Sequence, residues 1–118
     1  MRYRVQGPLR EVINCHCGQC RRTHGHFAAY TRARREDLAL EEDRGLRWYR
    51  SSPEARRGFC CECGASLFFD RLESDGIAIA AGTLDPPTGL RTVRHGFVAD
   101  AGDYYSIDDD LEKLPGLP

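Results

Sequence analysis

Short stretches of alternating apolar and polar residues, separated by glycine and proline, run along the whole chain. In Leu46-Arg47-Trp48-Tyr49, for example, the side chains alternate with the period of two that is typical of a half-buried strand. Turn residues recur so closely that strands fit between them but helices of a dozen residues do not. The pattern predicts strands over Tyr3–Val5, Val12–Asn14, Phe27–Thr31, Leu46–Arg50, Gly58–Cys60, Ser66–Phe69, Ile77–Ala80, Thr92–Val93 and Phe97–Ala99.

Helix is predicted only in short pieces, at Gly18–His24, Arg34–Asp37 and Ile107–Leu114. The fold class is therefore mainly β, with several small antiparallel sheets and few short helices. A length of 118 residues fits a single domain spanning residues 1–118. Elements this short bury a modest core, which a bound metal would help to stabilise.

The cysteines are gathered in two groups. The N-terminus lacks the apolar segment of an export signal, so we expect a cytoplasmic protein with reduced thiols. Cysteines two or three positions apart converge on one ion more readily than they form a disulfide. The two groups therefore predict metal binding, and they consist of Cys15, Cys17 and Cys20, then Cys60, Cys61 and Cys63.

The first group has the spacing Cys-x-Cys-x-x-Cys. At the end of a strand, Cys15 and Cys17 project to the same face, and Gly18 permits a tight turn that returns Cys20 to the same ion. Three thiolates suit zinc, which takes four tetrahedral ligands and keeps one position open where it is catalytic. His16 lies between two ligands, so we expect it to point away from the metal into solvent.

The second group contains Cys-x-x-Cys followed by glycine, which is typical of a zinc knuckle. Cys60 and Cys63 are the predicted ligands, Gly64 lets backbone amides approach the sulfurs, and Cys61 should point elsewhere. A pair of cysteines supplies half of a tetrahedral site. From spacing alone, a single zinc ribbon that combines this pair with two cysteines of the first group is an open alternative.

Charge and hydropathy exclude several classes of partner. The formal net charge is -1 and no basic-aromatic ribonucleoprotein motif is present, which argues against a nucleic-acid partner. The mean hydropathy of -0.54 and the lack of an apolar run of about 18 residues argue against a membrane span. Arg21 and Arg22 directly follow Cys20, where guanidinium groups either favour an anion or form a solvated face.

Three segments together resemble the glutathione-dependent formaldehyde-activating enzyme family, also called centromere protein V-like domains. They are Cys15–Gly25, Leu46–Ser52 and Arg57–Leu67, and the tail, with His95–Val98 and Leu114-Pro115, is also similar. The resemblance implies a β-tent-like fold. It also implies a substrate-side zinc held by Cys15, Cys17 and Cys20, and it makes Cys60 and Cys63 half of a structural zinc site.

One feature departs from the family pattern. Members usually carry an earlier Cys-x-Cys, in a strand immediately upstream of the stretch that corresponds to Arg2–Val5, and the printed sequence starts after that point. Either this start lies too late or this member has lost the structural site. We therefore expect the site at Cys60 and Cys63 to be incomplete.

The resemblance implies a zinc-dependent carbon–sulfur lyase similar to S-(hydroxymethyl)glutathione synthase. The expected partners are a thiol such as glutathione and a small aldehyde, with Cys15, Cys17 and Cys20 as the catalytic metal ligands and Arg21 as a substrate-binding residue. Zinc with three thiolates carries a net charge of -1, which suits a fourth thiolate better than hydroxide. The alternative function is a non-catalytic, zinc-stabilised binding module.

Overall fold

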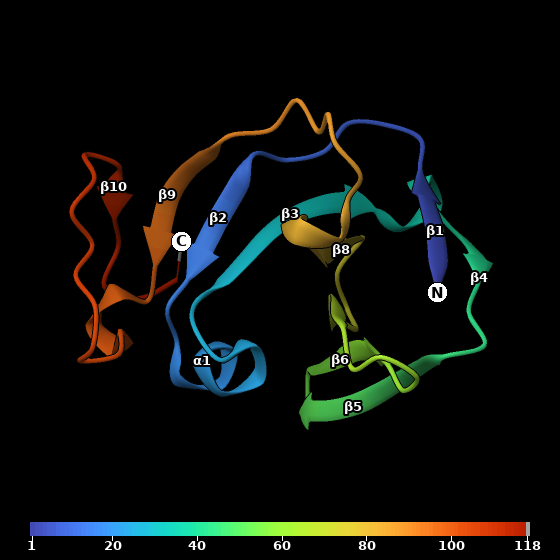
Figure 1. Cartoon of the computed structure of the whole chain (residues 1–118), viewed down its shortest axis with the longest axis horizontal. Coiled ribbons are helices and arrows are strands. Elements are labelled where there is room, and N and C mark those ends of the chain that lie inside the picture. Colours follow the sequence, from blue (N-terminus) through green and yellow to red (C-terminus); the bar gives the residue numbers. More distant parts are fainter. Residues whose placement is uncertain (118) are drawn as a thin grey trace.

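The computed structural model describes residues 1–117, and Figure 1 shows the course of the chain. No helix in this range has the length and apolar character that crossing a membrane requires. The elements of the described residues are β1 (Arg2–Val5), β2 (Val12–Cys15), α1 (Gly18–His24), β3 (Ala28–Arg34), β4 (Leu38–Glu42), β5 (Leu46–Ser52), β6 (Ala55–Cys60), β7 (Ser66–Arg71), β8 (Gly76–Ala80), β9 (Thr92–Gly96) and β10 (Glu112–Lys113), with 3-10 turns at Arg35–Asp37, Ala81–Thr83 and Val98–Asp100.

The strands form two sheets. The larger has eight strands in the order β10-β9-β2-β3-β8-β7-β6-β5, and the smaller is the antiparallel pair β1-β4. Two pairings in the large sheet, β2 with β9 and β9 with β10, are parallel. In Figure 1 the β1-β4 pair lies at the opposite end of the molecule from β9 and β10, and α1 lies beyond the ends of β2 and β3.

The mainly β class predicted from the sequence is confirmed. The expected strands correspond to β1, β2, β3 and β5 to β9, and the expected helix at Gly18–His24 is α1. The strands are arranged in two sheets, however, rather than in several small antiparallel ones. The sequence analysis missed β4 and β10, whose mostly exposed positions leave little apolar alternation to detect.

Two predicted elements at the C-terminal end are wrong. Phe97–Ala99 is not a strand, because Phe97 adopts a left-handed backbone conformation (φ 55°) and a 3-10 turn follows it. Ile107–Leu114 is not a helix. The Asp109 carboxylate accepts a hydrogen bond from the backbone N–H of Leu111, and the chain then adds β10 to the edge of β9. Pairing between distant segments outweighs the local pattern in both cases. The backbone N–H of Phe97 donates to the carbonyl of Gly116, and that of Val98 donates to the carbonyl of Leu114.

The central strands carry different side chains on their two faces. On β7 and β8, Phe68 and Ile79 belong to the main core, and β1 and β4 contribute further side chains to that core. Their neighbours Phe69 and Ala78 point to the other face, because successive side chains alternate along a strand. That second face is hollow, because Tyr30, Phe69 and Ala78 line a large cavity there instead of a filled core. The candidate site lies on this hollow face.

Candidate metal centre

Cys15, Cys17 and Cys20 converge on one point, as their spacing predicts. Their sulfur atoms all lie within 4.8 Å of one another, at the end of β2 and in the first turn of α1. Sulfurs around a tetrahedral zinc, with Zn–S of about 2.3 Å, are about 3.8 Å apart, so a small inward movement suffices. The donor set and its geometry fit a thiophilic metal ion.

The helix, rather than a special glycine conformation, returns Cys20 to the other two cysteines. Cys17 is the N-cap of α1, and its sulfur accepts a hydrogen bond from the backbone N–H of Cys20 at 3.3 Å. Gly18 has no positive φ, so the tight turn expected there is the start of α1. The sulfur that caps α1 therefore belongs to the triad, which ties the triad to the helix.

A buried guanidinium lies against the triad. The Nη2 atom of Arg57 donates to Cys20 Sγ at 3.5 Å, and its Nη1 donates to the Tyr30 hydroxyl at 3.2 Å. The hydrogen bond from Cys15 and then the Arg57 guanidinium lower the pKa of Cys20 to about 6, against the effect of burial. The hydrogen bond with Cys20 and burial raise the pKa of Cys15, which keeps the shared proton. Of this pair, Cys20 is therefore the thiol that ionises first.

Behind Arg57, a second hydrogen bond holds Tyr30 in place. The Tyr30 hydroxyl lies 2.9 Å from His24 Nε2, and the two rings meet edge to face. Burial, and then the positive charge of Arg57, lower the pKa of His24. A neutral His24 can accept the Tyr30 proton while the hydroxyl oxygen accepts from Arg57. One arrangement of protons therefore completes all three hydrogen bonds of the chain Cys20–Arg57–Tyr30–His24.

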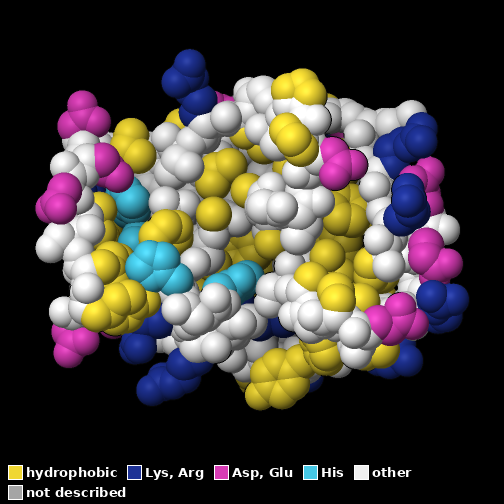
Figure 2. All heavy atoms as spheres, viewed as in Figure 1, with side chains coloured by type: hydrophobic (Ala, Val, Ile, Leu, Met, Phe, Trp, Pro, Cys, Tyr) yellow, Lys and Arg dark blue, Asp and Glu magenta, His cyan; other side chains and the backbone are white. Residues whose placement is uncertain are grey.

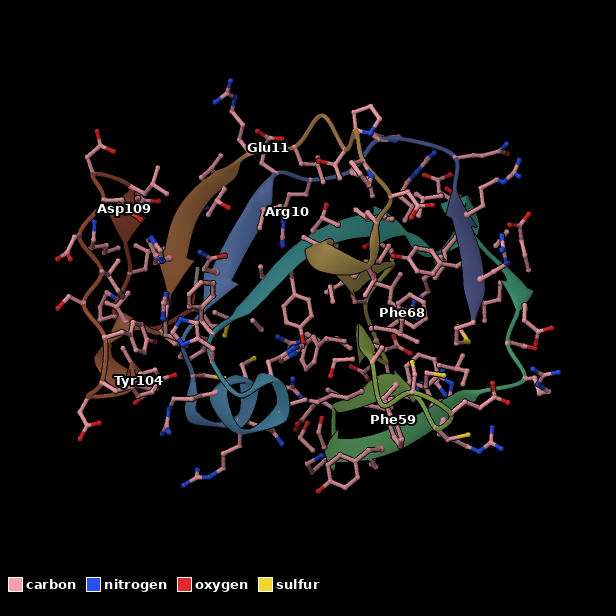
Figure 3. All side chains as sticks on the ribbon, viewed as in Figure 1. Arg10, Glu11, Phe59, Phe68, Tyr104 and Asp109 are labelled. Carbon is pink, nitrogen blue, oxygen red and sulfur yellow. The ribbon has the colours of Figure 1, made fainter. Side chains whose placement is uncertain are left out.

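The triad lines a cavity of about 890 Å³ whose walls are rich in arginine. This volume is within the range of about 300–1,000 Å³ that is usual for small-molecule sites. Figure 3 shows Arg10 pointing inward from the chain before β2, whereas the neighbouring Glu11 points outward. Two glutamates, Glu54 and Glu73, also line the cavity, and the arginines are Arg10, Arg32, Arg50, Arg57 and Arg71.

The expectation that His16 is exposed to solvent is wrong. His16 is 1% exposed, although it does point away from the triad as the alternation along β2 requires. His16 lies beside His95 of the neighbouring strand β9 and packs against Tyr105 of the segment that follows β9. His16 Nε2 lies 2.9 Å from His95 Nδ1, and its Nδ1 lies 2.5 Å from the Tyr105 hydroxyl. In the view of Figure 2, the histidine side chains lie in the left half of the molecule, next to hydrophobic side chains.

The hydrogen bonds of these groups fix their protons. His95 Nε2 lies 2.8 Å from a carboxylate oxygen of Asp109, which can only accept, so Nε2 carries a proton and the neutral form of the ring offers Nδ1 as an acceptor. His95 therefore accepts from His16, and His16 accepts from Tyr105. Burial, followed by the neighbouring histidines His95 and His26, lowers the pKa of His16 to about 4, in keeping with a neutral ring. The chain of hydrogen bonds attaches the C-terminal segment to the residue between Cys15 and Cys17.

Replacing His95 by leucine should destabilise the protein by about 1–3 kcal/mol, because the N–H of His16 would be left buried without an acceptor. Urea denaturation of His95→Leu and the wild-type protein at pH 7.5 measures this difference. Asp109→Ala is the control: its partly exposed carboxylate can be replaced by water, so the loss should stay below about 1 kcal/mol. Equal loss in both variants would contradict the buried chain.

Cys60 and Cys63 form the predicted knuckle at the end of β6. Gly64 adopts a left-handed conformation (φ 78°), and its N–H donates to the Cys60 carbonyl at 2.7 Å. Backbone N–H groups of Cys63 and Glu62 lower the pKa of Cys60, which is buried, while Cys61 and Cys63 are exposed. Met1 packs against the core cluster that contains Cys60.

The two cysteine groups belong to different parts of the core. Cys60 packs in the main core with Phe68, whereas Cys20 packs with Tyr30 on the hollow face. Within residues 1–117, one group of three or more histidine, cysteine, aspartate or glutamate side chains has ligand atoms that all lie within 4.8 Å of one another. This group is the first triad. The single-ribbon arrangement is therefore not what the structure shows, and the incomplete metal site expected at Cys60 and Cys63 stays a prediction.

Arg21, the predicted substrate-binding residue, lies on α1 but is not among the described residues that line the cavity. Its Nε atom is buried without a hydrogen-bond partner in the described part of the chain. The arginines that do line the cavity come from other elements, and Arg57 on β6 is the one that contacts the triad. Its role was missed, since nothing in the local pattern distinguishes Arg57 from the adjacent Arg56.

Comparisons with known proteins agree with this geometry. No curated protein matches the chain. A crystal structure of a Rhodobacter sphaeroides protein, determined by structural genomics, is similar with a TM-score of 0.57 and 25% sequence identity, covering 71% of this chain and 79% of that one. A family model described as glutathione-dependent formaldehyde-activating enzyme matches residues 1–100, which include both cysteine groups. The chain therefore belongs to the glutathione-dependent formaldehyde-activating enzyme family.

Proposed function

We propose that the protein is a zinc-dependent carbon–sulfur lyase-type enzyme that joins a glutathione-like thiol to a small aldehyde such as formaldehyde, or splits their adduct. The observation that carries this proposal is the cysteine triad on the wall of an arginine-rich cavity. Cys15, Cys17 and Cys20 would hold the zinc, which when bound would keep the sulfur of the substrate in its thiolate form.

The charges of the cavity suit an anionic thiol. Glutathione has two carboxylates and one ammonium group, and the walls present five arginines against two glutamates. Arg10 donates to backbone carbonyls of Glu11 and Tyr30, and Arg50 donates to those of Ser52 and Pro53. Neither forms an ion pair within residues 1–117, so their charges are available to substrate carboxylates. The family membership supports the same substrate class.

Positioning accounts for the catalysis in this proposal. A thiolate and an aldehyde carbonyl held side by side react as if in one molecule, which removes much of the entropic barrier of the bimolecular reaction. The cavity is large enough to hold both reactants beside the triad. We also propose a cytoplasmic location, in which the thiols of the triad would stay reduced.

Exchange between free glutathione, formaldehyde and their adduct tests the proposal. With ¹³C-labelled formaldehyde, NMR exchange spectroscopy should give a rate that the zinc-loaded protein raises above the uncatalysed rate and that saturates with glutathione. Raising the salt concentration should weaken glutathione binding, because exposed ion pairs are screened. An exchange rate unchanged by the zinc-loaded protein would reject the enzyme and favour the zinc-stabilised binding module.

A further inference from the structure

Arg57 is a buried cation without a carboxylate partner. It is 6% exposed on β6, and within residues 1–117 it enters no ion pair, whereas the adjacent Arg56 is paired with Asp70. A buried guanidinium is costly unless a negative group lies against it. The acidic group that lies against Arg57 is the Cys20 thiol, whose sulfur accepts a hydrogen bond from Nη2 at 3.5 Å. The cysteine triad is therefore positioned to supply the counter-charge of Arg57.

Arg57 also has hydrogen-bonding capacity that the protein does not use. Its Nε atom is buried and has no partner among the described residues, and each Nη atom carries a second hydrogen. The side chain lines both the large cavity and a second cavity of about 260 Å³, and Tyr30 is also common to the two. Buried N–H groups are nearly always paired, so an unpaired one on a cavity wall points to a ligand.

We propose that Arg57 is a catalytic residue that binds the aldehyde oxygen and the alkoxide formed from it; this inference rests on the proposed function. In the reaction, the thiolate sulfur attacks the carbonyl carbon and forms the S–C bond. The π electrons of the C=O bond move to the oxygen, which takes up the proton that the thiol released. Arg57 donates hydrogen bonds to this oxygen while its charge develops, in the manner of an oxyanion hole.

Tyr30 and His24 are positioning residues in this scheme. The Tyr30 hydroxyl holds Nη1 of Arg57, and His24 in turn holds that hydroxyl. The Nη2 atom is directed to Cys20 Sγ, so the guanidinium plane is fixed at two points beside the sulfur atoms of the triad. In the adduct, the oxygen is bonded to the carbon that carries the substrate sulfur. With that sulfur beside the triad, we expect this oxygen to come within reach of the unpaired N–H groups of Arg57.

A comparison of two small sulfur ligands tests whether Arg57 binds the oxygen of a ligand independently of its sulfur. Thioacetate places an oxygen in the S–C–O arrangement of the product, whereas ethanethiol has a methyl group at that position. Calorimetric titration of the zinc-loaded protein with each ligand compares the wild type with Arg57→Lys, which keeps the charge but loses the planar fork of donors. We expect thioacetate to bind about 10- to 100-fold more weakly to the variant and ethanethiol to change by less than about threefold.

Kinetics give a second readout. The rate of adduct formation at saturating glutathione should fall about 10²- to 10³-fold in Arg57→Lys, while the Kd of glutathione changes by less than about threefold. Arg47→Gln is the matched control, because Arg47 is exposed on the neighbouring strand β5 and donates only to backbone carbonyls. If Arg57→Lys fails to fold or to hold zinc, Tyr30→Phe replaces it, with a smaller loss in the same direction.

The outcomes separate the two proposals. If the variant at position 57 binds thioacetate as tightly as the wild type, the role of Arg57 is rejected whatever the activity of the wild type. If the wild type shows the Arg57-dependent preference for thioacetate but forms no adduct, the proposed function fails and Arg57 stands as an oxygen-binding residue.

Discussion

The Cys17→Ser variant should lose its zinc and, with it, any acceleration of glutathione–formaldehyde exchange. Structural zinc sites contribute about 10–16 kcal/mol over four ligands, so removing one thiolate should weaken binding by more than about 100-fold. Serine is also a favourable N-cap, so the start of α1 should survive the substitution. The change therefore tests ligation by Cys17 with little disturbance of the helix that carries Cys20.

Zinc content after dialysis against a competing chelator measures this effect. Cys61→Ser is the matched control, because Cys61 is an exposed thiol outside the triad, and it should retain the zinc of the wild-type protein. If Cys17→Ser kept as much zinc as Cys61→Ser, Cys17 would not be a ligand, and the metal would have to be held elsewhere.

Replacing Asp70 by asparagine should cause the largest loss of stability, about 2–3 kcal/mol. Asp70 is 0% exposed and is paired with Arg35 and, at 2.8 Å, with Arg56 Nε. The variant would leave both guanidinium groups without a charged partner next to the core. The estimate is below the full cost of breaking a buried ion pair, about 3–5 kcal/mol, because both arginine side chains are 37% exposed.

The effect should depend on pH with a defined sign. Burial raises the pKa of Asp70, but the hydrogen bonds and charges of Arg35 and Arg56 outweigh it and leave that pKa below its ordinary value of 3.8. The stabilisation is thus fully present above pH 4 or so and disappears as the pH falls through the folded-state pKa. Urea denaturation at pH 7 and at pH 3 measures it.

Asp75→Asn is the control for this experiment. Asp75 is 95% exposed and lies 3.5 Å from Arg32, so its loss should cost less than about 0.5 kcal/mol. A difference between Asp70→Asn and the wild type that stayed constant down to pH 3 would contradict the carboxylate as the source of the stabilisation.

The local sequence was sufficient for most of the strands and for the convergence of the cysteine triad. Frequent turn residues limit the length of each element, and the Cys-x-Cys-x-x-Cys spacing brings three sulfurs together through a strand end and one helical turn. The turn at Cys60 is local as well, and its glycine, Gly64, adopts a left-handed conformation. Each of these features depends on contacts within a few residues, which the sequence pattern records directly.

The environment of those residues depended on distant segments. His16 was expected in solvent because alternation gives only the face on which a side chain lies; the strand β9 and Tyr105, 89 residues away, decide that this face is buried. The helix predicted at Ile107–Leu114 failed for the same reason, since pairing with β9 outweighs local propensity. Arg57 likewise gained its place beside Cys20 from the order of strands, in which β6, β7, β8 and β3 follow one another across the sheet. Sequence spacing thus determined which sulfurs meet, and only the packing of remote strands decided which charges and cavity surround them.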